Sequence, residues 1–294
     1  MRRCACFIPV LLLSLLFFSC GKKQKQNYEH TQANAAKRTA LKIVSLGGQT
    51  TEIIFSLGKG KAIVGRDVTS IYPEQALAIT SVGRGKAITA ESILSTNANL
   101  LVMPEGQLKK ETVDQLQAAK MDILTYPDKK SINQLKSAVK IISEKLDRKR
   151  EGEAILSQID RDLAGLHAAK DKRPKVLFVY ARGSGAMSIA GNNTFAEEII
   201  RLAGGQLAVE GIKDFKPLTP EGLIQANPDF MLFFDSGLKS LGGKEGVLKI
   251  QGVSETTAGK KMQIISMEGS LLSSFGPRLG QAVKELHEKI SVHQ

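Results

Sequence analysis

The sequence predicts an α/β protein in which two similar lobes are joined by a long helix, and three observations support this prediction. From Leu41 onward, apolar runs of strand length alternate with longer amphipathic stretches, a pattern typical of βαβ units around a parallel sheet. Between Ser131 and Lys170 no strand-like run occurs, and Ile155 and Ile159 follow helical spacing. Two further segments, 130 residues apart, share one pattern, as expected if each lobe contains the same unit. A single doubly wound sheet with one long crossover is the alternative architecture.

Residues 1–19 have the pattern of a signal peptide that is removed from the mature protein. A basic start, the apolar run 7–18 and a small residue before Cys20 follow one another in the expected order. The run is too short to span a bilayer as a stable helix. We therefore expect Cys20 to carry a lipid, with residues 20–40 as a flexible polar tether that reaches about 25 Å from the membrane. An ordinary secretory signal and an uncleaved anchor are the alternatives.

The placement of cysteines and charges excludes several classes of site. Cys4 and Cys6 lie in the removed segment, so Cys20 is the only thiol of the mature chain, and neither a disulfide nor a thiolate metal site is expected. The net charge is +12, but residues 1–40 hold seven Lys or Arg and one Glu, which accounts for half of the surplus. The other half, from 34 basic and 28 acidic residues, is an ordinary solvated surface, and no nucleic-acid partner is expected.

Seven strands are expected in order along the mature chain. They are residues 42–46, 62–64, 100–103, 123–126, 176–180, 230–234 and 263–266. Helix starts are marked by Ser131 with Gln134 and by Thr194 with Glu197, which fit the capping box, and by Pro220, which suits the first helical position. The expected division is an N-terminal lobe over 41–146, an inter-lobe helix over 147–172 and a C-terminal lobe over 173–294.

The two matching segments are residues 88–103 and 218–233. In this alignment Thr89 matches Thr219, Glu91 matches Glu221, and Asn97 matches Asn227. Each threonine is a natural N-cap, and a carboxylate two residues later lies near the positive end of the helix dipole. Each lobe is therefore expected to contain a capped helix, an Asn turn and a buried strand.

No enzyme motif is complete in this chain. Gly183-Ser184-Gly185 lacks the spacing of a nucleophile elbow, and the four histidines give it no evident base. No two histidines have metal-ligand spacing, so a histidine-built zinc or manganese site is not expected. Glycine-rich and polar segments instead follow several predicted strands, at the sheet edge where open α/β proteins bind ligands. These observations favour a binding protein, with a secreted α/β hydrolase and a lipoprotein adhesin as alternatives from other classes.

Seven short motifs follow one another along the chain. They are Ile43-Val-Ser-Leu-Gly-Gly48, Thr51-Glu-Ile53, Val64-Gly65, Thr69-Ser-Ile-Tyr-Pro73, Ser81-Val-Gly-Arg84, Ser236-Gly-Leu-Lys-Ser-Leu-Gly-Gly243 and Phe275-Gly-Pro-Arg278. In this order they resemble the haemin-binding proteins of ABC importers, from Lys42 to about Ile290. The resemblance implies the class III periplasmic-binding-protein fold, in which two Rossmann-like lobes joined by a rigid helix hold haem in the cleft between them. The same group serves cobalamin and ferric siderophores, which are the alternative ligands.

The resemblance also implies roles for individual residues. Tyr72 matches the axial tyrosine of the haem-binding members, and a phenolate is a hard anionic oxygen that suits ferric iron; a packing corner at Tyr-Pro is the alternative. No histidine occurs in the loop after Tyr180, so five-coordinate tyrosinate haem is expected, with Tyr180 and Met187 as the next candidate ligands. Further cations are expected to bind the haem propionates or to be ordinary surface charges; these are Arg66, Arg84, Lys86 and Arg182.

Glu91 and Glu221 match the two glutamates through which this group docks onto arginines of a permease dimer. Their equivalence between the lobes is what symmetric docking requires, although a helix-dipole role explains each of them alone. The expected partners are therefore haem, an ABC permease dimer and a membrane reached through the lipid anchor. The expected location is the periplasmic or extracellular side of that membrane, and no catalytic activity is expected.

Overall fold

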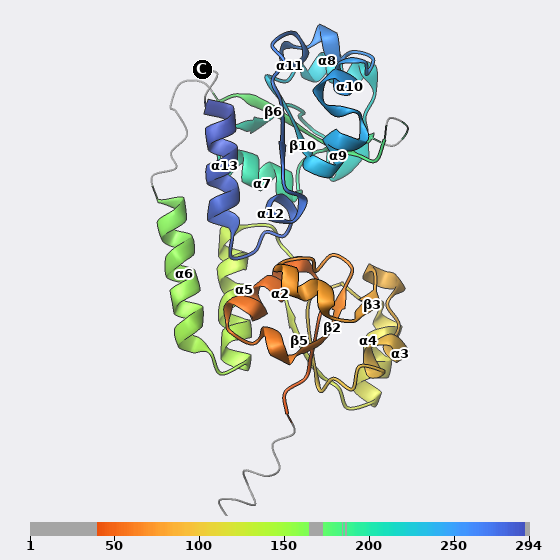
Figure 1. The fold of residues 1–294 in the computed structure, drawn as a ribbon, viewed down its shortest axis with the longest axis vertical. Coiled ribbons are helices and arrows are strands. Elements are labelled where there is room, and N and C mark those ends of the chain that lie inside the picture. The colour runs from red at the N-terminus through yellow and green to blue at the C-terminus, as the bar shows by residue number, and fades with distance from the viewer. Residues whose placement is uncertain (1–39, 165–172, 184, 186, 292–294) are drawn as a thin grey trace, which may run out of the picture. The chain divides into compact units, whose positions relative to one another are not determined.

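The computed structural model of the chain describes residues 40–164, 173–183, 185 and 187–291 (Figure 1). The expected signal peptide, Cys20 and the tether up to residue 39 lie outside these residues. The described residues from Leu41 onward belong to one compact unit. None of the helices in this described part combines the length and the apolarity that crossing a bilayer needs.

The first lobe is built on a five-stranded sheet in which all pairings are parallel. The strands are β1 (Ile43–Ser45), β2 (Ile63–Asp67), β3 (Ser81–Gly83), β4 (Leu100–Pro104) and β5 (Asp122–Tyr126). Their order is β3-β2-β1-β4-β5, so the winding direction reverses between β1 and β4. Open α/β sheets bind ligands beyond the carboxyl ends of their strands, at such a reversal. The loops after β1 and β4 are therefore the ones that this topology places at a ligand site.

Helices cover the first sheet. They are α2 (Gly48–Ser56), α3 (Ala90–Leu94) and α4 (Lys110–Ala118), with 3-10 turns at Gly60–Ala62, Glu74–Ala78 and Gly85–Ala87. Because both faces of the sheet are covered, every residue of β1 and β4 is buried. The continuous apolar runs that predicted these strands have this physical cause.

The second lobe is built on a mixed sheet. Its strands are β6 (Lys175–Ala181), β7 (Met187–Ala190), β8 (Gln206–Leu207), β9 (Phe215–Pro217), β10 (Phe230–Phe234) and β11 (Ile264–Met267). The order is β11-β10-β6-β7-β9, with β8 paired to β6. β6, β10 and β11 are parallel, whereas β7 and β9 run antiparallel to their neighbours.

The helices of the second lobe follow its strands in sequence order. They are α7 (Phe195–Leu202), α8 (Pro220–Ala226), α9 (Asp235–Ser240), α10 (Gly243–Leu248), α11 (Thr257–Lys260), α12 (Gly269–Ser273) and α13 (Leu279–Ser291), with a 3-10 turn at Val253–Glu255. Two sheets with helices around them confirm the predicted α/β fold class.

The strand-free region between the two sheets forms two helices, where the sequence analysis expected one helix over 147–172. α5 (Ile132–Lys145) and α6 (Lys149–Leu163) pack against each other and are joined at Asp147, whose φ of 54° lies in the left-handed region. A Cβ added at Gly152 would lie 2.5 Å from the Ser143 hydroxyl oxygen, so glycine permits this close helix contact. The second helix ends at Leu163, because Ala164 adopts extended backbone. Residues 165–172 lie outside the described residues.

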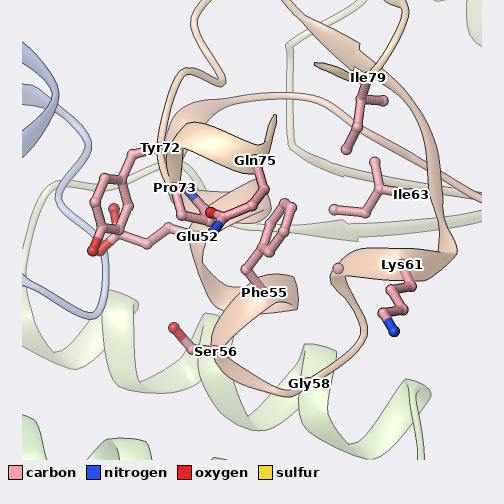
Figure 2. A pocket seen from close by; sticks show the side chains of 11 residues that line it. Glu52, Phe55, Ser56, Gly58, Lys61, Ile63, Tyr72, Pro73, Gln75 and Ile79 are labelled. Carbon is pink, nitrogen blue, oxygen red and sulfur yellow. The ribbon is translucent and has the colours of Figure 1, made fainter. Parts of the chain in front are cut away.

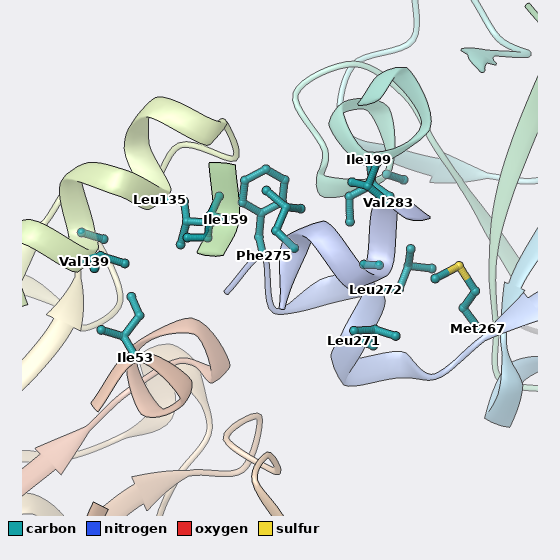
Figure 3. Packing of buried hydrophobic residues seen from close by; sticks show 14 of the residues in the cluster. Ile53, Leu135, Val139, Ile159, Ile199, Met267, Leu271, Leu272, Phe275 and Val283 are labelled. Carbon is teal, nitrogen blue, oxygen red and sulfur yellow. The ribbon is translucent and has the colours of Figure 1, made fainter. Parts of the chain in front are cut away.

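One hydrophobic cluster contains residues of both lobes and of the helices between them. Phe275, which is fully buried, lies between Leu135 and Ile159 on one side and Leu272 and Val283 on the other (Figure 3). Helices α5, α6, α12 and α13 thereby carry the apolar core from the first sheet to the second. The joint between the lobes is a packed interior, and such interiors resist deformation.

The helix starts predicted at Ser131, Thr194 and Pro220 are confirmed. The hydroxyl oxygen of Ser131 accepts a hydrogen bond from the backbone N–H of Gln134 at 3.4 Å, and that of Thr194 accepts one from the backbone N–H of Glu197 at 3.3 Å. The reciprocal half of the first capping box is absent, since the side-chain oxygen of Gln134 is buried without a partner in the described residues. All seven predicted strands are present, while β3, β7, β8 and β9 were not predicted.

We expect Phe275→Ala to lower the free energy of unfolding by about 3–5 kcal/mol, because it removes a fully buried ring from the cluster that joins the lobes. Phe215→Ala is the matched control, since Phe215 is 41% exposed and its loss is expected to be at most half as large. Urea denaturation of both variants measures the difference. Equal losses would contradict the assignment of Phe275 to a shared core.

Candidate functional site

A hollow of 530 Å³ is lined by loops from both lobes, and we call it the inter-lobe cleft. The first lobe contributes the loop after β2, with Val68, Thr69 and Ile71, and Arg84 after β3. The second lobe contributes the carboxyl ends of β6, β10 and β11, with Tyr180, Ala181, Arg182, Phe234, Asp235 and Glu268. The second-lobe residues lie at the carboxyl ends of strands, as the topology rule expects, whereas the first-lobe residues follow β2 and β3 and not the strands at the reversal.

The cleft brings Arg84 and Arg182 together from opposite lobes. Among described residues, the arginines that pair with carboxylates are Arg148, Arg201 and Arg278, so the two cleft arginines have no such partner there. Arg182 lies 5.3 Å from the centroid of the Tyr180 ring, a cation–π contact. Both guanidinium groups are thus available to carboxylates of a ligand.

The acidic residue Glu268 lines the cleft on the side of the second lobe. Its carboxylate accepts hydrogen bonds from the backbone N–H groups of Ser270 and Leu271, both at 2.7 Å, and so caps α12. Burial alone would raise the pKa of Glu268, but these hydrogen bonds and that of the Ser270 hydroxyl hold the pKa below its usual value. This carboxylate is therefore charged at neutral pH and is held by α12.

A second buried carboxylate, Asp67, fixes the loop after β2. It accepts from the Gly47 backbone N–H at 3.0 Å and from the hydroxyls of Thr69 and Ser70, both at 2.5 Å. Arg66 secures the same loop from outside, because its Nε donates to the Ala76 carbonyl at 2.7 Å. The segment that carries Tyr72 is thus held at both ends.

Tyr72 is 39% exposed and is not among the residues that line the cleft. The residue before it, Ile71, lines the cleft, while Tyr72 itself lines a neighbouring hollow of 770 Å³ beside α2. Figure 2 shows Tyr72 and Glu52 at one end of this α2 hollow, with Phe55 and Ile63 farther in. The phenol ring is therefore accessible from the α2 hollow, while its neighbour Ile71 lines the cleft.

Arg278 covers the ring of Tyr72, with its guanidinium carbon 3.3 Å from the ring centroid. The same guanidinium donates to Glu52 at 3.1 Å and to the Ser270 hydroxyl at 3.2 Å, and the Arg278 backbone N–H donates to Glu52 at 3.0 Å. Glu52 is almost fully buried. One arginine therefore links the candidate iron ligand, a buried carboxylate and the cleft residue Ser270.

The motif Phe275-Gly-Pro-Arg278 alone predicted no role for Arg278. Its contacts join segments 226 residues apart, and no local pattern encodes such a pairing. The feature that could have indicated a role for Arg278 is its place in a motif without helical or strand periodicity.

The remaining predicted site residues are spread more widely. Arg66 donates two hydrogen bonds to backbone carbonyls, those of Ala76 and Asp67, and it does not line the cleft. Lys86 is exposed in a 3-10 turn. Met187 lines a different hollow, with Leu218 and Pro220, so the structure does not bring it to Tyr72. No group of three metal-ligating side chains occurs in the described residues.

Glu91 and Glu221 occupy equivalent positions in the two lobes. Each is exposed in the first turn of its helix, and the cap threonines Thr89 and Thr219 accept hydrogen bonds at 3.2 and 3.1 Å. The matching Asn97 and Asn227 both have positive φ, of 53° and 37°. Helices α3 and α8 both lie away from α6 (Figure 1).

Comparison with known families matches residues 43–271 to the family described as periplasmic binding protein. Among solved structures, the periplasmic heme-binding protein RhuT from Roseiflexus sp. RS-1, in apo form, is 36% identical with a TM-score of 0.80, over 85% of this chain and 98% of that one. The periplasmic heme-binding protein BhuT in complex with two hemes is 30% identical with a TM-score of 0.80, over the same shares.

Curated relatives are more distant. An uncharacterized ABC transporter substrate-binding lipoprotein, YvrC of Bacillus subtilis, is 25% identical over 98% of this chain and 97% of its own length. A vitamin B12-binding protein of Vibrio campbellii is 22% identical over 68% of this chain and 73% of its own length.

We expect Arg278→Met to lower the free energy of unfolding by about 3–5 kcal/mol, because the buried Glu52 carboxylate loses its counterion. Adding Glu52→Gln is expected to restore most of the loss, since it removes the unpaired charge. Arg201→Met is the control, because the pair of Arg201 with Glu198 lies on a helix surface and contributes at most about 1 kcal/mol. Urea denaturation of the variants provides the comparison. A loss no larger than that of the control would contradict this account of the pair.

Proposed function

Because the chain belongs to the periplasmic binding protein family, we propose that it captures haem between its two lobes and delivers it to the permease of an ABC importer. Members of this family bind solutes, and the likeness extends over nearly all described residues. The proposal adds the cargo, the iron ligand and the docking residues to that family membership.

The observation that carries the proposal is the pairing of Tyr72 with Arg278. Ferric iron is a hard acid, and a phenolate oxygen is a hard anionic ligand. A guanidinium 3.3 Å above the ring compensates the negative charge that the iron-bound oxygen would carry. The buried Glu52 in turn accepts one hydrogen bond from this guanidinium and one from the Arg278 backbone N–H, and so holds the side chain in place.

Of the other tyrosines, Tyr126 does not fit the role of iron ligand. Burial raises the pKa of Tyr126 well above its usual value, and its hydroxyl hydrogen-bonds to Thr50 at 2.8 Å. Because the Thr50 hydroxyl donates to the Leu46 carbonyl, Tyr126 must be the donor in that bond and stays protonated. Tyr180 lines the cleft and is the alternative ligand, while Tyr28 lies outside the described residues.

Haem also carries two propionates, which need cationic partners. Arg84 and Arg182 line the cleft from opposite lobes without a carboxylate partner in the described residues, and guanidinium binds carboxylates bidentately. The proposal assigns the propionates to these two side chains. Arg66 is a weaker candidate, since two of its donors already bind backbone carbonyls.

Tyr72→Phe is expected to abolish the tyrosinate charge-transfer bands of the ferric complex and to weaken ferric haem binding by more than tenfold, or about 1.4 kcal/mol. The substitution keeps the ring under Arg278 and deletes only the oxygen, so packing changes little. Haemin titration followed by the Soret band provides both readouts. Ferrous haem is expected to bind poorly to the unmodified protein, since reduction softens the iron.

Tyr180→Phe is the matched control for this experiment, because Tyr180 is the phenol that lines the cleft itself. Its haem complex is expected to keep the tyrosinate bands. If Tyr180→Phe loses them and Tyr72→Phe does not, the ligand is Tyr180.

The proposed handover uses Glu91 and Glu221 as charged contacts with the permease dimer. Both carboxylates are exposed, lie at equivalent positions in the two lobes and make no ion pair within the described residues. Two equivalent acidic contacts suit a partner with two-fold symmetry.

Reversing both glutamates to Lys is expected to leave haem titration unchanged and to abolish haem uptake in cells or reconstituted vesicles. The matched control is the double variant Glu111→Lys and Glu245→Lys, which reverses an exposed first-turn glutamate in each lobe at other helices. Uptake should survive in the control. Survival of uptake in the Glu91 and Glu221 variant would leave these residues only their helix-dipole role.

We further propose that the mature chain begins at Cys20, which carries a lipid, and that residues 20–40 tether the two lobes to the outer side of the membrane. The relative from Bacillus subtilis is named a lipoprotein, which supports this part of the proposal. Cobalamin is the second candidate cargo, since vitamin B12-binding proteins are among the relatives. If an equimolar amount of cobalamin displaces most of the haemin and reverses the saturable Soret shift, cobalamin is the stronger ligand.

A further inference from the structure

We propose that Leu94 and Ile224 form the apolar half of the surface that docks onto the permease, one beside each of the acidic contacts. This inference rests on the proposed function, and it adds an apolar contact that the charges alone do not supply. The partner it describes is a two-fold symmetric membrane protein that presents, twice, a cationic side chain next to a shallow apolar depression.

The first observation is the exposure of these two side chains. Leu94 is 39% exposed and Ile224 is 43% exposed. Singly exposed aliphatic residues are ordinary on protein surfaces and need no explanation. Exposure alone therefore carries no inference.

The second observation is that the two positions are equivalent. Leu94 and Ile224 are 130 residues apart, the same offset that relates Glu91 to Glu221 and Asn97 to Asn227. Among the large hydrophobic residues that are exposed in the described part of the chain, no other two have this offset. Both lobes thus present an aliphatic side chain to solvent at the same place in the same unit.

The third observation is the position of each aliphatic residue on its helix. In both α3 and α8 it follows the glutamate by three residues, and side chains with that spacing lie on one helix face. Ile224 also packs close to the backbone at Gly252, where an added Cβ would lie 3.3 Å from the Cγ1 atom of Ile224. The charge and the apolar group therefore form one patch in each lobe.

The combination has a physical advantage that neither part has alone. An ion pair between exposed groups contributes little, because water and salt screen it. An aliphatic side chain that excludes water beside the pair raises the strength of the interaction, as the residues around interface hot spots do. Part of each side chain is buried within its own lobe, and the exposed part, 39% of Leu94 and 43% of Ile224, is the surface that the proposal assigns to the permease.

The test uses the full-length protein and the haem permease with its ATPase in nanodiscs. The double variant Leu94→Gln and Ile224→Gln is expected to bind the permease about tenfold more weakly than the wild type, with each single variant weaker by about threefold. The difference should persist at about 1 M salt, where the contribution of the glutamates is screened. The matched control is Leu77→Gln with Met262→Gln, one exposed residue in each lobe outside the patches, and it should bind like the wild type.

Each outcome bears on a different claim. If reversal of Glu91 and Glu221 weakens permease binding but the Leu94 and Ile224 variant binds normally, the apolar contact is refuted and the proposed function stands. If haemin gives no Soret shift while the Leu94 and Ile224 variant loses permease binding, the cargo is wrong and the docking surface stands. If the wild type does not bind the permease, both fail. Thermal melting of all variants excludes unfolding as the cause.

Discussion

Glu52 in α2 and Arg278 ahead of α13 form a buried ion pair between the two lobes, at 3.1 Å and across 226 residues of chain. Burying two charges gains little net free energy, since desolvation offsets most of the attraction. The pair instead determines how the side chains around it are arranged. It holds Arg278 against the ring of Tyr72 and against Ser270 in the cleft, so the geometry of the proposed iron ligand depends on it. We therefore interpret the ion pair as selecting one arrangement of these side chains, and not as a large contribution to the free energy of unfolding.

The shared core has a related effect on the cleft. Phe275 and its neighbours continue one apolar interior from the first sheet to the second, so the lobes do not meet only through a flexible linker. A packed interior has one preferred arrangement and deforms little. The backbone of the loops that carry Arg84 and Arg182 is thereby preorganised, while both side chains are exposed. Such preorganisation lowers the entropic cost of binding.

The sequence predicted what depends on local pattern. Continuous apolar runs identified the covered parallel strands, and β10 was predicted with its observed bounds at Phe230–Phe234. Edge strands such as β9 are exposed at every residue and carry no such run, so they were missed. The break between α5 and α6 depends on the left-handed backbone of Asp147, which no periodicity reveals. Tyr72 could be proposed from its motif, but its contact with Arg278 depends on tertiary structure and could not be.

The long separation of Glu52 from Arg278 also bears on how the chain reaches its native state. During synthesis the whole first lobe leaves the ribosome before Phe275 and Arg278 exist, so its carboxylate lacks a counterion and its core lacks a ring. Contacts between distant segments form late in folding, because loop closure must come first. The first lobe therefore completes its core and its buried ion pair only after the segment with Phe275 and Arg278 has joined it.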